Sequence, residues 1–463
     1  MTQITPQPPG STSRIRRGQI VAWGLWDWGS AAFHTVIITF VFSVYITSSV
    51  GKGLCTVDQL SPDGACPAAV SWLGWALGIA GFFIAVLAPI TGQRADAGGR
   101  RKMSIGVFTG VTVASMLALY FVKADTSYLW WGLVMMGVGS ITMEFAGVSY
   151  NAMLRQISTP KNIGRISGFG WSMGYFGGIF LLLACYVGFI ASDKGSAVAG
   201  VLDISKDAGL NIRLVAVLAA VWLAVFALPV LFAVPELPAV DAEARMGFFA
   251  SYRKLGRHVA ALWRTERHTV LFLIASALFR DGLAGVFTFG AVLAVAVYGF
   301  DPGGVLIFGV AANVVAALGA VVAGRYDDRI GPKAVIVTSL IGTLVAGTTL
   351  LFVSGSGMFW IFGLALCLFV GPAQSSSRTF LARLTRTDNE GEMFGLYATT
   401  GRAVSFLAPA LFGVFVAVFH SSRAGIIGIL LVLAVGLAAL LPVRGPARTS
   451  APGSAHNESR ASD

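Results

Sequence analysis

The sequence has few charged residues for its length. Only 12% of its 463 residues are Asp, Glu, Lys or Arg, whereas 56% are hydrophobic. A soluble globular chain is usually about 25% charged, and it needs that polar surface to cover its core. The scarcity of charge therefore excludes an ordinary soluble protein and indicates a surface that faces lipid.

Residues suited to metal or nucleotide chemistry are also sparse, with four Cys and five His in the whole chain. No group of them has metal-ligand spacing, and no P-loop or dinucleotide fingerprint lies between a strand and a helix. Residues 170–174 match the Gly-x-Ser-x-Gly elbow of hydrolases, but they open an apolar helix, where glycines serve packing. We therefore expect no enzyme activity, no metal and no cofactor.

Long apolar runs fill most of the chain. Each is long enough to cross the ~30 Å hydrocarbon layer as a helix, and none has the alternation of a barrel strand. The sequence therefore predicts an all-α membrane protein of twelve transmembrane helices. The expected spans, accurate to a few residues, are 20–48, 70–91, 103–122, 128–152, 166–190, 212–234, 269–297, 303–323, 334–353, 358–384, 393–419 and 424–442.

The spans divide the chain into two halves, expected to form pseudo-symmetric six-helix bundles over residues 20–234 and 269–443. Polar tails over 1–19 and 444–463 are expected to be disordered and cytoplasmic. The basic connection over 235–268 carries apolar residues at helical spacing among its cations. It predicts an amphipathic helix on the inner leaflet, near anionic lipid, with a solvated linker helix as the alternative.

The net charge of +11 has a membrane explanation, because Lys and Arg gather on the cytoplasmic side. With the N-terminus inside, 24 of the 33 Lys and Arg fall in inside segments, six in outside segments and three within spans. This asymmetry predicts that both termini are cytoplasmic, in what we expect to be a bacterial plasma membrane. We expect membrane lipids, rather than nucleic acid, around the chain.

Two loops, each after the second span of its half, repeat one pattern, Gly-x-x-x-Asp-x-x-Gly with a basic residue in the next two positions. We expect the glycines to allow a tight turn and the aspartate to accept hydrogen bonds from the N-terminus of the next helix. The loops are then hinges between conformations. Their residues are Gly92, Asp96, Gly99, Arg100 and Arg101 in the first and Gly324, Asp328, Arg329, Gly331 and Lys333 in the second.

The paired loops resemble the signature of the major facilitator superfamily. The resemblance implies two bundles around a central cavity that opens alternately to each side of the membrane. It also implies a small-molecule substrate, moved by secondary transport, and we expect a monomer.

Further segments resemble the vacuole-effluxer-like branch, which is related to fungal vacuolar amino-acid exporters. The family usually has Asn where this chain has Ser30, so substrate choice is expected to differ if that amide contacts the substrate. The matching segments are Trp-Asp-Trp-Gly-Ser-Ala-Ala-Phe at 26–33, Tyr-Asn-Ala-Met-Leu at 150–154, Ser-Gly-Phe-Gly-Trp-Ser-Met-Gly-Tyr at 167–175, Arg-Asp-Gly at 280–282 and Phe-Gly-Leu-Tyr at 394–397 before Gly401 and Arg402.

Ionisable residues within spans are costly and normally face a cavity or a partner. The resemblance implies that the spans holding them line the central cavity or the interface between the halves. The candidates for contacting the substrate or a coupling ion are Asp27, Ser30, Glu144, Asn151, Arg280, Asp281, Arg378 and Arg402.

Depth along the helices indicates which charges meet. At about 1.5 Å of rise per residue from the cytoplasmic ends, Asp27 and Arg378 lie roughly 10 Å deep, Glu144 and Arg402 roughly 12–14 Å, and Arg280 about 17 Å. Opposite charges at similar depth predict pairs between the halves. Either these pairs only hold the closed state, or they also bind the substrate.

Cavity charges of both signs suit an amino acid better than a neutral sugar, since a zwitterion needs both answered. A transporter that imports or exports amino acids is the expected function, and a membrane carboxylate that exchanges a proton would couple it to protons. A sugar, organic-anion or drug carrier is the alternative within the fold, and a transport-dead receptor or a membrane enzyme the alternative outside it.

Cys55 and Cys66 share the expected outside loop after the first span. An oxidising compartment would keep two such thiols joined, and Pro62, Asp63 and Gly64 favour a turn between them. The sequence therefore predicts a disulfide between Cys55 and Cys66.

Overall fold

The structure is a computed structural model that describes residues 16–59, 66–191, 197–236, 248–300, 302–385 and 389–445. Most of the two expected disordered tails therefore lies outside the described residues. Within the described residues, twelve helical segments are long and apolar enough to cross a membrane. Each overlaps one of the expected spans, so the span count and the all-α fold class are confirmed.

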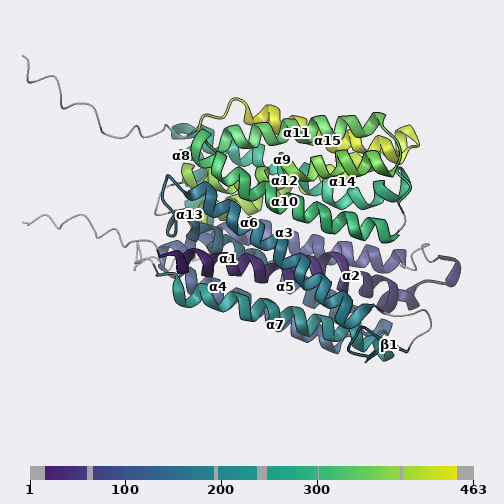
Figure 1. Ribbon diagram of the computed structural model, residues 1–463. Coiled ribbons are helices and arrows are strands. Elements are labelled where there is room, and N and C mark those ends of the chain that lie inside the picture. Colours follow the sequence, from purple (N-terminus) through teal and green to yellow (C-terminus); the bar gives the residue numbers. More distant parts are fainter. Residues whose placement is uncertain are drawn as a thin grey trace, which may run out of the picture.

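The N-terminal half contains six of these spans, and they form the lower bundle in Figure 1. Its first span begins as α1 and continues through a π-helical segment at Ala32–Phe40, the short α2 and a second π-helical segment at Ile46–Val50. A two-stranded hairpin, β1 (Val198–Ala199) with β2 (Ile204–Ser205), precedes the sixth span. The helices are α1 (Arg17–Ala31), α2 (Phe42–Tyr45), α3 (Pro67–Ala97), α4 (Arg101–Ala118), α5 (Leu129–Ala152), α6 (Ile163–Cys185) and α7 (Leu210–Ala233).

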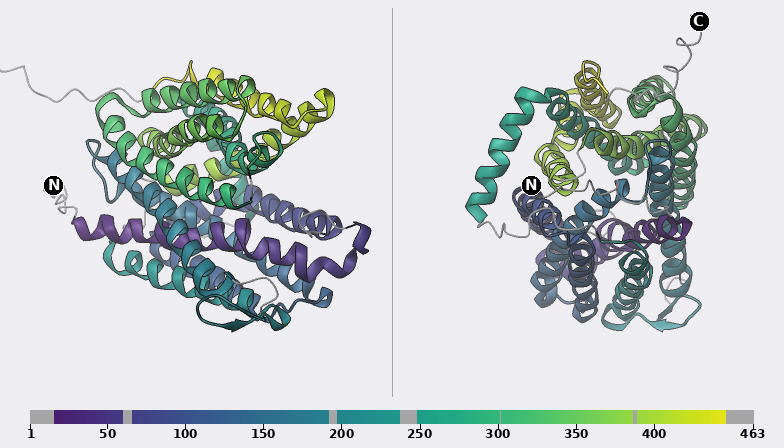
Figure 2. Two further views of the ribbon diagram at one scale, coloured as in Figure 1. Left: turned by 45° about the vertical axis from the view of Figure 1, so that its right-hand side comes forward. Right: turned by 90° about the vertical axis from the view of Figure 1, so that its left-hand side faces the viewer.

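The C-terminal half is a second bundle, and its fifth span is broken into two helices. The amphipathic α8 crosses beside the end of the bundles from one half toward the other (Figure 2). The helices are α8 (Phe248–Thr265), α9 (Arg267–Ala296), α10 (Pro302–Ile330), α11 (Pro332–Phe352), α12 (Ser356–Leu384), α13 (Glu390–Val404), α14 (Leu407–Phe419) and α15 (Gly425–Leu440).

The bundle has two ends of different character. One end carries α8 and the short connections from α3 to α4 and from α10 to α11; we call it the basic face. The opposite end carries β1 and the disulfide between Cys55 and Cys66, whose Cα atoms are 5.8 Å apart; we call it the disulfide face. Large apolar side chains such as Trp75, Phe82 and Phe232 are exposed along the spans, as a lipid environment allows.

The repeated glycine–aspartate segments differ from their expected form as loops. α3 runs through Gly92 and Asp96 to Ala97, and α10 runs through Gly324 and Asp328 to Ile330. Only the second glycine of each pattern turns the chain, with φ +58° at Gly99 and +97° at Gly331. The first glycine and the aspartate therefore lie on helices, where they face the opposite half.

Contacts between the halves run mainly along two groups of helices, α3 with α13 and α6 with both α10 and α12. In the first group, the Thr399 hydroxyl donates to the Ala85 carbonyl at 2.9 Å, and Gly395 packs against the carbonyl of Ala88. In the second, the Ser167 hydroxyl of α6 reaches the Ser375 carbonyl of α12 at 2.7 Å. These contacts lie on the half of the bundle toward the basic face, which is therefore closed.

Candidate functional site

Asp96 caps a helix of the opposite half. Its Oδ2 accepts from the backbone N–H of Glu392 at 3.1 Å, in the first turn of α13. Acceptors at this position satisfy N–H groups that have no partner within a helix, and a negative charge also suits the helix dipole. Asn389, the N-cap residue of α13 itself, makes no such bond. The expectation that Asp96 caps the next helix of its own half is therefore wrong.

Arg101 joins Asp96 to a second carboxylate across the interface. Its Nε and Nη2 donate to Asp96 Oδ1 at 2.9 and 2.7 Å, and its Nη2 reaches Glu390 Oε2 of α13 at 2.7 Å. All three side chains are at most 5% exposed. Arg155 adds a longer contact to Glu390, at 3.5 Å. We call Asp96, Arg101 and Glu390 the first basic-face cluster.

Asp328 forms the counterpart in the other direction. Its two carboxylate oxygens accept from the backbone N–H groups of Gly164 and Arg165 at 2.8 and 3.1 Å, at the start of α6 in the N-terminal half. The Arg165 side chain donates to Asp328 at 3.2 Å. The Arg383 guanidinium of α12 lies 3.4 Å from Asp328 and 3.1 Å from the neighbouring carboxylate of Asp327. We call Asp328, Arg165, Arg383 and Asp327 the second basic-face cluster.

The first glycine of each repeat makes room for these contacts. A Cβ at Gly92 would collide with the backbone carbonyl of Gly391 in α13. A Cβ at Gly324 would lie 2.7 Å from the carbonyl oxygen of Gly164 in α6. Backbone atoms cannot rotate away as a side chain does, so both positions require glycine while the basic face is closed.

The other basic residues of the repeats are exposed or bond another part of the chain. Arg100 and Arg329 are exposed, and Arg100 is the N-cap residue of α4. Lys333 holds the place in its repeat that Arg101 holds in the first, but its Nζ donates to the Leu441 carbonyl at 2.6 Å. The two repeats therefore differ in what their basic residues bind.

Asp27 and Arg378, predicted from their depth to meet, are joined across the interface. Arg378 Nη1 lies 3.3 Å from Asp27 Oδ2, and the side chains are 6% and 18% exposed. Tyr150 donates its hydroxyl to the same carboxylate oxygen at 2.8 Å. The candidate Asn151 also belongs here, because its Oδ1 accepts from Arg378 Nη1 at 3.2 Å.

Aromatic rings surround the Arg378 guanidinium. Its central carbon lies 4.9 Å from the ring of Trp23, 5.7 Å from that of Trp171 and 5.9 Å from that of Tyr150. None of these three aromatic residues was among the site residues predicted from the sequence. Trp23 precedes Asp27 by four residues, which places both on one helix face, and that spacing was the available signal.

Glu144 and Arg402 form a second pair between the halves, which we call the central pair. Arg402 Nη2 donates to Glu144 Oε2 at 2.9 Å. The Arg402 side chain is 38% exposed and the Glu144 side chain is 26% exposed, although both residues lie in the middle of long spans. His34 is exposed as well and interacts electrostatically with both members. The central pair therefore lies on an accessible surface inside the bundle.

Arg280 lies near the central pair and makes no salt bridge among the described residues. Its guanidinium sits 3.8 Å from the ring centre of Tyr397 and donates to the Tyr397 carbonyl at 3.3 Å. The Tyr397 hydroxyl bonds Ser377 at 2.7 Å, which holds the ring in place. Arg280 also interacts electrostatically with Glu144. Two guanidinium groups thus accompany one carboxylate.

Two candidates lie away from this surface. Asp281 is 7% exposed, and its Oδ2 accepts from the Ala408 N–H at 2.7 Å, so it caps α14 within its own half. Ser30 is also 7% exposed and donates its hydroxyl to the Asp27 carbonyl at 2.9 Å within α1. Neither side chain faces the central pair in this conformation.

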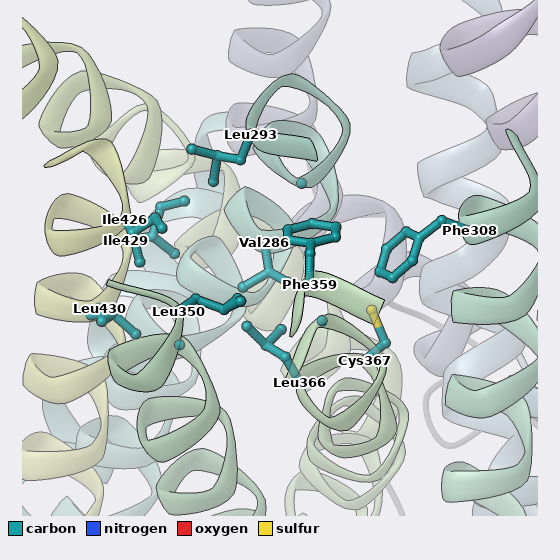
Figure 3. A pocket seen from close by; sticks show the side chains of 13 residues that line it. Val286, Leu293, Phe308, Leu350, Phe359, Leu366, Cys367, Ile426, Ile429 and Leu430 are labelled. Atoms are coloured by element: carbon teal, nitrogen blue, oxygen red, sulfur yellow. The ribbon is translucent and has the colours of Figure 1, made fainter. Parts of the chain in front are cut away.

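A cavity of about 50 Å³ lies within the C-terminal half (Figure 3). Apolar side chains from five helices surround it, Val286, Leu350, Phe359, Leu366 and Ile429 among them. No charged side chain lines it among the described residues, and a site without polar groups cannot orient a polar solute. We therefore place the candidate site at the central pair.

Comparison with solved structures identifies the class of fold. The chain superposes on the proton:xylose symporter XylE with a TM-score of 0.69 and 13% sequence identity, covering 92% of this chain and 94% of that one. It superposes on FucP in the outward conformation with a TM-score of 0.70 and 12% identity, covering 93% and 99%. The fold is that of the major facilitator superfamily.

Comparison of sequences then gives the family. Residues 16–447 match the family model described as vacuole effluxer Atg22 like. An uncharacterised MFS-type transporter, YxiO of Bacillus subtilis strain 168, is 25% identical over 90% of this chain and 93% of its own. Autophagy-related protein 22-1 of Neosartorya fischeri is 25% identical over 54% of this chain and 43% of its own. The chain is a major facilitator transporter and belongs to the vacuole effluxer Atg22 like family.

Proposed function

We propose that this transporter carries an amino acid, and that the substrate is bound at the central pair. The observation that supports the proposal is the imbalance of charge there. Glu144 of the N-terminal half is paired with Arg402 of the C-terminal half at 2.9 Å, and Arg280 adds a guanidinium that makes no salt bridge among the described residues. A zwitterion brings one carboxylate and one ammonium, and both must be answered in an interior of low dielectric.

Each group of the substrate has a partner of suitable geometry. Arg280 offers forked N–H donors to a carboxylate, and the face of Tyr397 beneath it keeps the guanidinium in place. Glu144 accepts from the ammonium once Arg402 releases it. The pair that joins the halves in the absence of substrate thus exchanges one partner for the substrate, which links binding to movement of the halves.

The coupling ion in this proposal is the proton. A carboxylate that loses its cationic partner inside the bundle is stabilised by binding a proton. Glu144 meets this condition when Arg402 moves away, and His34 beside it offers a route for transfer. Flux should then depend on an imposed proton gradient.

The basic face is assigned to the cytoplasm, and the membrane to the bacterial plasma membrane. The excess of Lys and Arg in the inside segments supports this orientation. With it, the closed basic face makes the structure an outward-facing state. Labelling of a cysteine introduced at the exposed Arg100 should require membrane permeabilisation, whereas labelling at the exposed Lys52 should not.

The direct test is uptake into proteoliposomes of a panel of radiolabelled amino acids, sugars and organic acids, with and without a proton gradient. We expect saturable amino-acid flux in the wild-type protein. Arg280→Gln should raise KM by tenfold or more, since a hydrogen bond to a charged group contributes about 1.5–3 kcal/mol. Arg423→Gln is the matched control, because Arg423 stacks on Tyr298 at the disulfide face, at 5.6 Å.

The double variant Glu144→Gln with Arg402→Gln separates binding from simple pairing. If the two residues only join the halves, removing both charges together should restore much of the activity that either single variant loses. If Glu144 binds the ammonium, the double variant should stay inactive. Recovery in the double variant would overturn the binding assignment while leaving the transporter class intact.

A sugar is the second candidate substrate, and aromatic side chains favour it. Tyr175 of α6 and Phe287 of α9 stack across the two halves with ring centres 6.4 Å apart, and Phe287 is 36% exposed. Apolar ring faces of this kind also suit the faces of a sugar. The same panel distinguishes the two, because sugar flux without amino-acid flux would replace the first proposal. Binding without flux would indicate a receptor.

A further inference from the structure

Arg378 belongs to the C-terminal half but is bound by groups of the N-terminal half. Its Nε donates to the Ser167 hydroxyl at 3.0 Å and its Nη2 to the Ser167 carbonyl at 2.6 Å. Its Nη1 reaches Asp27 at 3.3 Å and Asn151 at 3.2 Å. Every one of these acceptors lies in α1, α5 or α6.

Three aromatic rings of the N-terminal half complete the surroundings. Trp23, Tyr150 and Trp171 lie between 4.9 and 5.9 Å from the guanidinium carbon. We call Asp27 together with these three rings the cage. Aromatic rings around a cation, with a carboxylate beside them, are the arrangement that recognises organic ammonium ions.

The cage is held together without Arg378. Trp23 stacks on Tyr150 with ring centres 4.5 Å apart, and its Nε1 donates to the Tyr150 carbonyl at 3.1 Å. Trp26 also stacks on Tyr150, with ring centres 4.2 Å apart. The Tyr150 hydroxyl is bonded to Asp27 at 2.8 Å. Two walls and the carboxylate therefore keep their positions when Arg378 leaves.

Gly170 provides the space in which the cation sits. A Cβ there would lie 2.8 Å from both Arg378 Nη2 and Asp27 Oδ2, and 2.6 Å from Trp23. One turn further along α6, a Cβ at Gly174 would come no closer than 3.7 Å to any atom. The two glycines differ in whether a methyl group would fill the cage.

Opening of the basic face must withdraw Arg378, because α12 moves with the C-terminal half. Asp27 and the ring faces then lose their cation, and an unpaired carboxylate in such surroundings is costly. We propose that the cage is a binding site for a small organic ammonium ion, which Arg378 fills while the basic face is closed. The ion that replaces it is the ammonium group of the substrate, which passes from Glu144 to the cage when the basic face opens; this identification rests on the amino-acid function proposed above.

Calorimetric titration of the purified full-length protein in nanodiscs with ethylammonium at neutral pH tests the site. Arg378→Gln should bind ethylammonium about tenfold tighter than wild type or more, because wild type must first expel its own cation. Arg378→Met keeps packing against the rings without the charge, and it serves equally if the glutamine variant does not fold. If neither variant gains affinity, the cage binds no ammonium and the proposal is overturned.

A second substitution shows where on the protein the gain in ethylammonium affinity arises. In the Arg378→Gln background, Gly170→Ala and Asp27→Asn should each return the affinity to the wild-type level or below. Gly174→Ala, the matched control on the same helix, should leave the gain in place. A gain that survives Gly170→Ala would place the ion elsewhere. If the Arg378 variants do not bind ethylammonium at neutral pH, a proton alone neutralises Asp27, and the proposal is refuted.

This titration is independent of transport. Ethylammonium has no carboxylate, so it does not require Arg280, and binding is measured without flux. If the protein transports amino acids but the cage does not bind ethylammonium, the proposed function stands and the proposed ammonium site is refuted. Ethylammonium binding in the cage without amino-acid transport would keep the site and change the cargo to another ammonium compound.

Discussion

The first basic-face cluster draws its cation from its own repeat, whereas the second draws its cations from elsewhere. Arg101 follows Asp96 by five residues and bonds it directly. Lys333 occupies the matching place in the second repeat but bonds the end of α15, and Arg165 and Arg383 approach Asp328 instead. A shared sequence pattern therefore fixes the two helix caps but not the ion pairs around them.

Burial differs between the clusters as well. In the first, Arg101, Asp96 and Glu390 are at most 5% exposed. In the second, the Arg165 side chain is 59% exposed. Removing one member of a buried ion pair costs far more than removing an exposed one. The first cluster should therefore contribute more to closing the basic face, and four experiments compare the two.

The largest effect is expected from Arg101→Gln, which leaves two buried carboxylates without their cation. The closed basic face should lose about 3–5 kcal/mol. Alkylation of a cysteine at Thr399, whose hydroxyl bonds Ala85 across the halves, should become much faster. Lys333→Gln is the matched control and should change the rate little. Equal effects of the two substitutions would show that the first cluster does not contribute more than the second to closing the basic face.

Gly92→Ala and Gly324→Ala should come next and should resemble each other. Each new methyl group meets a backbone carbonyl of the opposite half, and such overpacking costs about 1–3 kcal/mol. The same alkylation assay should show faster labelling in both variants. Gly110→Ala is the control, because a Cβ there meets nothing within 4 Å. Normal labelling in either variant would show that its helix pair does not approach so closely.

Asp96→Asn and Asp328→Asn should both impair transport without preventing membrane insertion. An asparagine oxygen still accepts from the helix N–H groups, so mainly the charge is lost. The loss should be roughly 1.5–3 kcal/mol at Asp96, which also bonds a buried arginine, and about 1 kcal/mol at Asp328. Flux at equal expression measures this, and unchanged flux in both variants would refute a role for either aspartate in conformational change.

Arg165→Ala should have the smallest effect. An exposed ion pair contributes about 0.2–1 kcal/mol, and salt screens it. The change in alkylation rate should be slight at low ionic strength and absent at high ionic strength, while that of Arg101→Gln should persist. A large, salt-resistant effect would mean that the second cluster is as well shielded as the first.

The sequence was sufficient for the fold and for two of the ion pairs between the halves. Twelve spans follow from the length and spacing of the apolar runs, since a bilayer demands whole helices. Asp27 with Arg378 and Glu144 with Arg402 follow from equal depth. Depth locates a residue along the membrane normal only, so it could not show that Asp281, beside Arg280 in sequence, accepts from the start of α14 within its own half.

The sequence could not show which half each aspartate serves. Asp96 lies five residues beyond the expected end of its span at residue 91, so the nearest helix start along the chain is that of α4. The N–H groups it reaches belong to α13, almost 300 residues further on. Glu390 was missed for a related reason, because it lies at the boundary between a loop and a span, where charge is unremarkable. Only the packing of the halves brings these groups together.

The exchanged caps make each half a part of the other's secondary structure. The first turn of α13 is completed by Asp96 and that of α6 by Asp328, while Asn389 and Asn162 at the helix starts supply no cap. Separating the halves at the basic face therefore leaves two helix ends with free N–H groups, one on each side of the gap. Hydrogen exchange at the starts of α6 and α13 should rise together on opening, so the two helix ends report the conformational cycle as a single event.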